Sequence, residues 1–244
     1  MNELIRLDKF LASQLNISRS DAKKMLKKNS VSVNGNTVKN GDFSFDPYEC
    51  DVFVAGKKIE YNKYVYIMLN KPKGVVSATT DNEEKTVIDI LPESFIRSGL
   101  FPAGRLDKNT TGFVLITDDG DFAHRMLSPA HHVKKTYIAE TESELSDDDM
   151  KIFVNGMKIG DEVFKPAEIC FVGTNSENGH CRYEIKIVEG RYHQIKRMFA
   201  FVAHPVVELE RIRIGNLDLD PSLSPGEARY ISQKELCDIC SDNK

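Results

Sequence analysis

Residues 182–187, Arg182-Tyr183-Glu184-Ile185-Lys186-Ile187, alternate charged and apolar side chains. This period of two places the apolar side chains on one face of a β-strand and the charged side chains on the other face. Strands with one buried and one solvated face are typical of antiparallel sheets, because strands of parallel sheets are usually covered on both faces. The stretch therefore predicts a sheet that is largely antiparallel.

A helix is expected shortly after this strand. Ile195, Met198, Phe199 and Val202 follow the spacing i, i+3, i+4 and i+7, which forms one apolar helix face. Pro205 ends the pattern, because proline cannot continue a helix. The opposite face of the helix carries basic side chains: His193, Lys196 and Arg197.

Further strands and one more helix are expected on either side of these elements. Apolar runs bounded by turn residues predict strands at 64–69, 113–116, 136–139, 206–209 and 211–214. Apolar residues between Phe122 and Leu127 predict a short helix that ends at Ser128-Pro129. We therefore predict an α+β domain over residues 61–244, with a mixed, largely antiparallel sheet flanked by helices.

Residues 1–60 are expected to form a separate, small module. Leu4, Leu7, Leu11 and Leu15 recur at helical spacing, and Ser18 with Asp21 resembles the capping box of a second helix. The pair Asn34-Gly35 between alternating apolar residues predicts a tight hairpin. A polar, lysine-rich stretch at 56–63 marks the boundary with the larger domain.

Charge is distributed unevenly along the chain. The net charge is −4, which by itself disfavours a nucleic-acid partner. The first 40 residues, however, hold eight basic and three acidic side chains, a local charge of +5. The second expected helix contributes much of this charge through Arg19, Lys23, Lys24 and Lys27. This face is either a phosphate-binding surface or an ordinary solvated one.

Composition excludes several classes of protein. Five scattered cysteines do not form a disulfide framework, and no apolar run reaches the ~18 residues of a membrane span. The first residues also lack the pattern of a signal peptide, so we expect a cytoplasmic protein. Cys237 and Cys240 have zinc-ligand spacing without a second pair nearby, so no metal is expected. No nucleotide-binding motif or other cofactor motif is present, so no cofactor is expected.

The candidate catalytic residue lies in residues 104–112, Gly-Arg-Leu-Asp-Lys-Asn-Thr-Thr-Gly, where a single acid, Asp107, stands between Arg105 and Lys108. Neighbouring cations favour the ionised carboxylate, which can attack carbon and form a covalent intermediate. The alternative is a structural role, because Asp beside Gly and Thr is common in turns.

Two known families share motifs with this chain. Residues 6–11 (RLDKFL), 18–22 (SRSDA) and 31–35 (VSVNG) resemble the S4 RNA-binding module. Four further motifs resemble the RsuA family of pseudouridine synthases: 70–74 (NKPKG), 104–112 (GRLDKNTTG), 134–137 (KKTY) and 189–199 (EGRYHQIKRMF). Together these resemblances span nearly the whole chain.

The resemblance to the synthases implies a reaction in which the N1–C1′ bond of a uridine breaks and C5 bonds to C1′. It implies that Asp107 initiates the reaction, by attack on C1′, addition to C6 or a glycal route, and that Lys196 pairs with it. Tyr137 would stack on the flipped base or move the C5 proton, and Arg105 would fill the gap that the base leaves. The structural alternatives are core packing for Tyr137 and an ion pair for Arg105.

The resemblance also implies a substrate. The sequence Gly-Arg-Tyr-His-Gln at 190–194 is closer to the small-subunit enzymes, so we expect a monomer that modifies 16S ribosomal RNA or a small-subunit assembly intermediate. Further RNA contacts are expected from basic side chains beside the site: Lys71, Lys73, Arg191, His193 and Arg197. His131 and His132 are expected at the surface or in contact with RNA. The alternatives are a non-catalytic ribosome-assembly factor, or the same chemistry on 23S RNA or transfer RNA.

Overall fold

In the computed structural model, which describes residues 4–128 and 133–240, the chain divides into two compact units. The smaller unit holds the residues up to Val65 together with Ser94–Gly99. The larger unit holds Tyr66–Glu93 and the residues from Leu100 onward. Within the described residues, no helix is long and apolar enough to cross a membrane.

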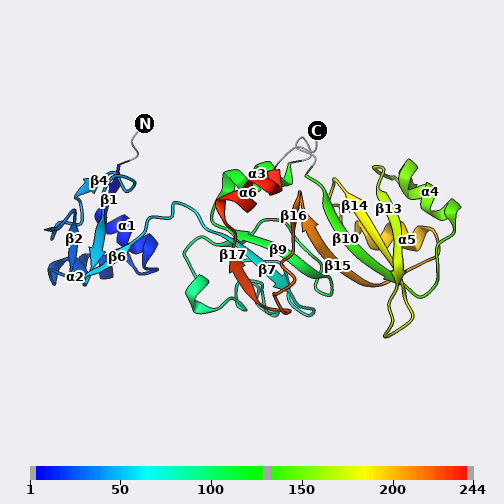
Figure 1. Ribbon diagram of the computed structural model, residues 1–244, viewed down its shortest axis with the longest axis horizontal. Coiled ribbons are helices and arrows are strands. Elements are labelled where there is room, and N and C mark those ends of the chain that lie inside the picture. Colours follow the sequence, from blue (N-terminus) through cyan, green and yellow to red (C-terminus); the bar gives the residue numbers. More distant parts are fainter. Residues whose placement is uncertain (1–3, 129–132, 241–244) are drawn as a thin grey trace. The chain divides into compact units, whose positions relative to one another are not determined.

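The smaller unit combines two helices with short antiparallel strands (Figure 1). One sheet has the strand order β3-β2-β5-β6, and β1 pairs separately with β4. The elements are β1 (Ile5–Arg6), α1 (Leu7–Gln14), α2 (Arg19–Lys27), β2 (Val31–Val33), β3 (Asn36–Thr37), β4 (Ser44–Phe45), β5 (Val52–Val54) and β6 (Lys57–Ile59).

Local sequence signals account for much of this unit. The hydroxyl of Ser18 accepts a hydrogen bond of 3.1 Å from the backbone N–H of Asp21, so Ser18 caps α2 as predicted. Asn34 and Gly35 adopt φ angles of 48° and 80° between β2 and β3. Positive φ at both central residues is what a tight type I′ hairpin requires, so the predicted hairpin is confirmed.

The first helix begins later than the leucine spacing predicts. Leu7 and Leu11 are fully buried, but the side chain of Leu4 is 66% exposed. Ile5 and Arg6 are extended because they pair with Phe45 and Ser44 of β4. The prediction that Leu4 shares the apolar face of α1 is therefore wrong.

The larger unit is built on a nine-stranded sheet whose main path has the order β13-β14-β10-β15-β9-β7-β17. The first elements of the larger unit along the chain are β7 (Tyr66–Lys71), β8 (Phe101–Pro102), β9 (Thr111–Thr117), α3 (Gly120–Leu127), β10 (Lys135–Thr141), α4 (Asp147–Asn155), β11 (Met157–Ile159) and β12 (Glu162–Phe164). β11 and β12 form a separate two-stranded sheet. The 3₁₀ turn η1 (Glu93–Phe95) begins in the larger unit, and its last two residues belong to the smaller one. The remaining elements are β13 (Glu168–Thr174), β14 (Cys181–Ile187), α5 (Gln194–Phe201), β15 (Val206–Ile214), β16 (Leu217–Asp218), β17 (Ala228–Tyr230) and α6 (Gln233–Cys240).

The predicted fold class is confirmed. Tyr183, Ile185 and Ile187 of β14 are buried, whereas Arg182, Glu184 and Lys186 are only partly buried. Among the described strands of this sheet, only β9 and β15 pair in parallel. The sheet is therefore mixed and largely antiparallel.

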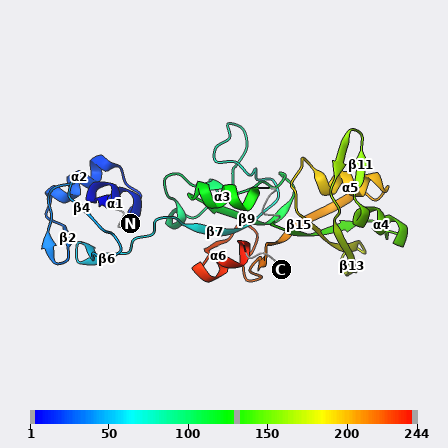
Figure 2. The same ribbon diagram turned by 90° about the horizontal axis from the view of Figure 1, so that it is seen from above.

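Helices cover the two ends of this sheet separately (Figures 1 and 2). Near β7 and β9, α3 and α6 contribute Phe122, Met126 and Ile239 to one buried apolar cluster. Near β13 and β14, the ring of Phe199 on α5 packs against Phe153 of α4, with centroids 4.8 Å apart. The cleft described below lies between these two cores, where β10, β15 and β9 are neighbours.

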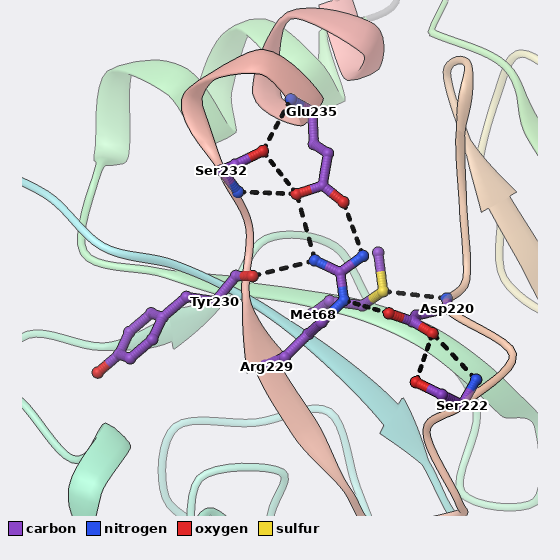
Figure 3. Close-up of polar contacts among 7 residues, drawn as sticks. All are labelled: Met68, Asp220, Ser222, Arg229, Tyr230, Ser232 and Glu235. Atoms are coloured by element: carbon purple, nitrogen blue, oxygen red, sulfur yellow. Dashed lines mark hydrogen bonds and ion pairs between the residues drawn. The ribbon is translucent and has the colours of Figure 1, made fainter.

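The C-terminal segment is fastened to the sheet by Arg229 of β17 (Figure 3). Its guanidinium donates to Asp220 at 2.5 Å and to Glu235 of α6 at 2.7 Å. The hydroxyl of Ser232 also donates to Glu235, at 2.7 Å. This network links α6 to β17 and to Asp220.

Candidate active site

Sheet order brings three distant parts of the sequence together. Strands β10, β15 and β9 are consecutive in the sheet, and they carry Tyr137, Arg211 and the loop of Asp107. Three adjoining hollows open here and share Arg105, Gly190 and Arg191. Asp107 lines two of them, and one of these two is also lined by Tyr137 and Lys196.

The backbone around Asp107 is held by Ser77. The backbone N–H of Leu106 donates to the Ser77 hydroxyl at 3.0 Å, and this hydroxyl donates to the Leu106 carbonyl at 3.1 Å. On the other side of Asp107, the Thr110 N–H donates to the Asp107 carbonyl at 3.1 Å. The carboxylate therefore projects from a loop whose backbone is fixed on both sides.

The structure corrects the prediction that Lys71 contacts RNA. Its side chain is fully buried, because β7 continues through Lys71 into the interior. Its ammonium donates to the carbonyls of Lys108 and Thr110, both at 2.9 Å, and to that of Pro72 at 3.0 Å. Lys71 thus stabilises the Asp107 loop through hydrogen bonds to its backbone. Burial lowers its pKa to about 8, an effect that the Asp107 carboxylate opposes and the Lys196 cation reinforces.

Two basic side chains approach the Asp107 carboxylate from the start of α5. Nζ of Lys196 lies 3.3 Å from Oδ2, and Nε2 of His193 lies 3.4 Å from Oδ1. The side chain of Asp107 is 29% exposed, so the carboxylate is both paired and accessible from the cleft. The predicted pairing of Lys196 with Asp107 is present in the structure.

The loop before α5 sets the position of these groups. His193 precedes the helix with a φ of 48°, a left-handed conformation that turns the chain sharply. Gln194 accepts a hydrogen bond from the Arg191 N–H at 3.1 Å and donates to Glu189 at 2.9 Å. These bonds fix the first turn of α5, from which His193 and Lys196 reach the carboxylate.

Tyr137 is 8% exposed and lies at the cleft beside Arg211. An irregularity between β10 and β15 pairs Thr136 with Arg213 but Tyr137 with Arg211. Because directly paired residues share a face of a sheet, this β-bulge puts Arg211 on the face of Tyr137 and Arg213 on the other. Nη1 of Arg211 lies 3.4 Å from the Tyr137 hydroxyl and donates to it.

Arg105 lines all three hollows and is exposed. Its guanidinium has no hydrogen-bond or ion-pair partner among the described residues. The alternative of an ion pair for Arg105 is therefore not what the structure shows.

The other basic residues predicted beside the site are placed differently. Arg191 lines the cleft and pairs with Glu189 at 3.3 Å. Arg197 instead faces away, pairing with Glu162 with its guanidinium 4.9 Å from the ring centre of Phe164. Lys73 is exposed and pairs with Glu208 at 2.5 Å. Neither Lys73 nor Arg197 lines any of the three hollows.

The predicted basic residues of α2 belong to the smaller unit. Arg19 donates to the buried carboxylate of Asp8 at 2.9 Å, and Nζ of Lys23 lies 3.7 Å from it. Burial raises the pKa of Asp8, but hydrogen bonds from Arg6 and Arg19 outweigh this and hold it at about 2. Lys24 pairs with Asp21 at 2.8 Å, whereas Lys27 has no partner among the described residues.

Sequence reasoning missed the positioning roles of Lys71 and Ser77 and the proximity of Arg211. Only Arg211 carried a usable signal, because it falls within an expected strand next to the cleft. His131 and His132 lie outside the described residues. Within 4–128 and 133–240, no three His, Cys, Asp or Glu side chains gather as a metal site.

The sequence profile of the RNA pseudouridylate synthase family matches residues 65–201, which include the whole Asp107 cleft except β15. The S4 domain profile matches residues 5–47 of the smaller unit. This chain belongs to the RNA pseudouridylate synthase family. It is accordingly an RNA pseudouridine synthase with an N-terminal S4 domain.

Relatives of this family are similar over nearly the full length. The chain is 42% identical to an uncharacterized RNA pseudouridine synthase of Bacillus subtilis, covering 95% of this chain and 97% of the relative. It is 42% identical to the ribosomal small subunit pseudouridine synthase A of Escherichia coli K12, covering 96% and 100%. A crystal structure of a pseudouridylate synthase has a TM-score of 0.64 at 34% identity, covering 96% of this chain and 99% of that one.

Proposed function

We propose that this synthase isomerises one uridine of small-subunit ribosomal RNA, with Asp107 as the group that initiates the reaction. The observation that carries the proposal is the Asp107 carboxylate, accessible in the cleft and paired with Lys196 at 3.3 Å. The small-subunit synthase of Escherichia coli, similar over the full length, supports the choice of RNA.

The proposed reaction needs an ionised carboxylate at the start. Attack on C1′, addition to C6 and the glycal route all begin with electron density or base strength that a neutral acid lacks. Lys196, 3.3 Å from the carboxylate, orients it toward the cleft. After the N1–C1′ bond has broken, the uracil turns, C5 bonds to C1′, the C5 proton leaves and N1 gains a proton.

Tyr137 and Arg105 have complementary proposed tasks. The Tyr137 ring lies beside the Asp107 hollow, where it can stack on a uracil that has left its helix. Its hydroxyl, which accepts a hydrogen bond from Arg211, would accept or relay the C5 proton. Arg105, exposed and without a partner among the described residues, is suited to fill the place of the flipped base.

The wider RNA contacts are divided between the two units. In the cleft we propose that Arg105, Arg191 and His193 contact RNA, and in the S4 domain the exposed face of α2 around Lys27 contacts phosphates. We also propose that the enzyme acts as a monomer. We propose that the enzyme acts in the cytoplasm, because bacterial ribosomal subunits are assembled there.

Pseudouridine mapping tests the proposal. Naked 16S RNA and partly assembled small subunits are incubated with the protein and then mapped, with 23S RNA and transfer RNA in parallel. One new pseudouridine in the small-subunit RNA is expected. Modification confined to 23S or transfer RNA would contradict the substrate, and tight binding without modification of any RNA would favour an assembly factor.

A further inference from the structure

Two buried cations beside the Asp107 hollow lack an acidic partner among the described residues. The Lys135 side chain is 8% exposed and forms no hydrogen bond or ion pair there. The Arg211 side chain is 4% exposed, and within the described part of the chain it donates only to the Phe113 carbonyl, at 2.7 Å, and to the Tyr137 hydroxyl. Its Nη2 is buried and has no partner among the residues that the structure describes.

Such an arrangement is costly for the folded protein. A buried charge without a partner pays a desolvation penalty that no attraction offsets, and two like charges also repel one another. Both effects act on Lys135, because burial and the Arg211 cation lower its pKa to about 8. Buried ionisable groups with shifted pKa values are common at binding and catalytic sites.

Both side chains face a hollow that is strongly basic. The bulge between β10 and β15 puts Arg211 on the face that Tyr137 shares with Lys135, two residues earlier in the strand. The hollow has a volume of about 570 Å³. Among the described residues, its charged lining consists of five basic side chains and one acid: Arg105, Lys135, Lys165, Arg191, Arg211 and Glu189.

The single acid does not neutralise this lining. Glu189 already accepts from the Lys165 N–H and the Gln194 amide, both at 2.9 Å, and pairs with Arg191. Arg105 and Lys165 are exposed at the hollow, and their charged groups have no partner within the described part of the chain. The hollow therefore presents uncompensated positive charge that one anion could satisfy.

We propose that this hollow, with Lys135 at its floor beside Arg211, binds one phosphate of the RNA backbone next to the target uridine. The inference rests on the proposed function, because this hollow shares Arg105, Tyr137 and Arg191 with the hollow lined by Asp107 and Lys196. A base that enters the Asp107 hollow brings its own flanking phosphates close to the neighbouring basic hollow. A phosphodiester supplies the negative charge and the several acceptor oxygens that Lys135 and Arg211 lack.

Replacing Lys135 tests the site in the full-length enzyme. Lys135→Met removes the charge and keeps most of the side-chain length. The matched control is Lys134→Met, which alters the neighbouring, partly exposed lysine that pairs with Glu168 at 2.7 Å. Affinity for small-subunit RNA should fall about tenfold in Lys135→Met, the usual effect of one lost hydrogen bond to a charged group. The slope of log K against log [salt] should become shallower by about 0.7 to 0.9, one phosphate contact.

The phosphate itself is identified by neutral linkages. A set of short RNAs that contain the target uridine is made, each with one methylphosphonate linkage at a different position next to that uridine. One linkage should weaken binding to the wild-type and Lys134→Met enzymes about tenfold. It should have a clearly smaller effect on Lys135→Met, in which Arg211 still contacts the phosphate but Lys135 no longer does. If Lys135→Met binds less tightly but no linkage shows this pattern, the anion is not a backbone phosphate and the proposal is overturned.

Folding and activity measurements separate the possible failures. Thermal melting of Lys135→Met should show equal or higher stability, because the variant removes an uncompensated buried cation. Should the variant fold poorly, the methylphosphonate scan on the wild-type enzyme decides alone. Pseudouridine formation by the wild type, with Lys135→Met binding like Lys134→Met, would overturn the phosphate site only. A wild-type enzyme that forms no pseudouridine would overturn the proposed function instead.

Discussion

The ammonium of Lys196 lies 3.3 Å from Oδ2 of Asp107, although Lys196 belongs to the first turn of α5 and Asp107 precedes β9. The two elements are far apart in the sequence, and the folded sheet brings the two side chains together. His193 approaches the second carboxylate oxygen at 3.4 Å. The carboxylate is thus oriented from one side and open on the other.

Lys196→Met is expected to lower the single-turnover rate of pseudouridine formation by about a hundredfold, because the carboxylate loses the cation that orients it. Lys196→Arg preserves the charge and should retain most of the rate. RNA affinity, measured by filter binding, should change little in both variants. Equal rates for the Met and Arg variants would show that the cation plays no part in orienting Asp107.

Gly112→Ala should destabilise the protein by about 3 kcal/mol or more. Gly112 has a φ of 95°, and a Cβ there would overlap the carbonyl of Arg211 and lie 2.9 Å from its N. The parallel pairing of β9 with β15 depends on this close approach. Urea denaturation measures the loss.

The matched control for Gly112 is Gly120→Ala at the start of α3, where no atom of the described residues lies within 4 Å of an added Cβ. This change should leave stability unchanged or raise it by up to about 1 kcal/mol. Similar stabilities for the two alanine variants would mean that β9 and β15 tolerate separation at Gly112.

The double variant Lys27→Ala, Lys28→Ala should reduce the salt dependence of RNA binding. Both lysines are exposed and have no partner in the described part of the chain. Two lost phosphate contacts should reduce the slope of log K against log [salt] by about 1.4 to 1.8. Lys151→Ala is the control, because Lys151 pairs with Asp148 at 2.7 Å. An unchanged slope in the double variant would exclude this face of α2 from RNA binding.

The contribution of the two buried lysines to the stability of the protein should rise between pH 8 and pH 10.5. Lys135 has a folded-state pKa of about 8 against an ordinary value of 10.5, so in this window the unfolded chain binds more protons. Folding then becomes more favourable as pH increases. Lys71 acts in the same direction, since its pKa is also about 8.

Comparison with Lys135→Met isolates the contribution of Lys135 to this rise. The variant should be more stable than the wild type at pH 7, and the difference should shrink by on the order of 3 kcal/mol by pH 10.5. The groups that face Lys135 across the hollow are Arg105, Lys165, Arg191, Arg211 and Glu189. A constant difference between the two proteins from pH 7 to pH 10.5 would show that Lys135 titrates normally.

Features encoded locally were predictable from the sequence. The alternation through Tyr183, Ile185 and Ile187 records which face of β14 is buried, because neighbouring side chains of a strand point to opposite faces. The Asn34-Gly35 turn and the Ser18 cap depend on only a few adjacent residues. The Asp107–Lys196 pair came instead from the resemblance to known synthases, and the structure places the two side chains together.

Features that depend on long-range contacts were not predictable. Lys71 precedes a proline, and the sequence therefore predicts an exposed lysine in a loop. In the structure its ammonium donates to the carbonyls of Lys108 and Thr110, which only the folded sheet brings near. The position of Arg211 depends on a bulge in the pairing of β15 with β10, which has no local sequence signal. Leu4 matches a helical spacing but is displaced by strand pairing at Ile5.

The most direct test of Asp107 is tritium release from small-subunit RNA that contains 5-tritiated uridine. The wild-type enzyme should release tritium, and Asp107→Asn should release none while binding the RNA with nearly unchanged affinity, since the change removes charge and little shape. Measurable tritium release by Asp107→Asn would contradict the role assigned to this carboxylate.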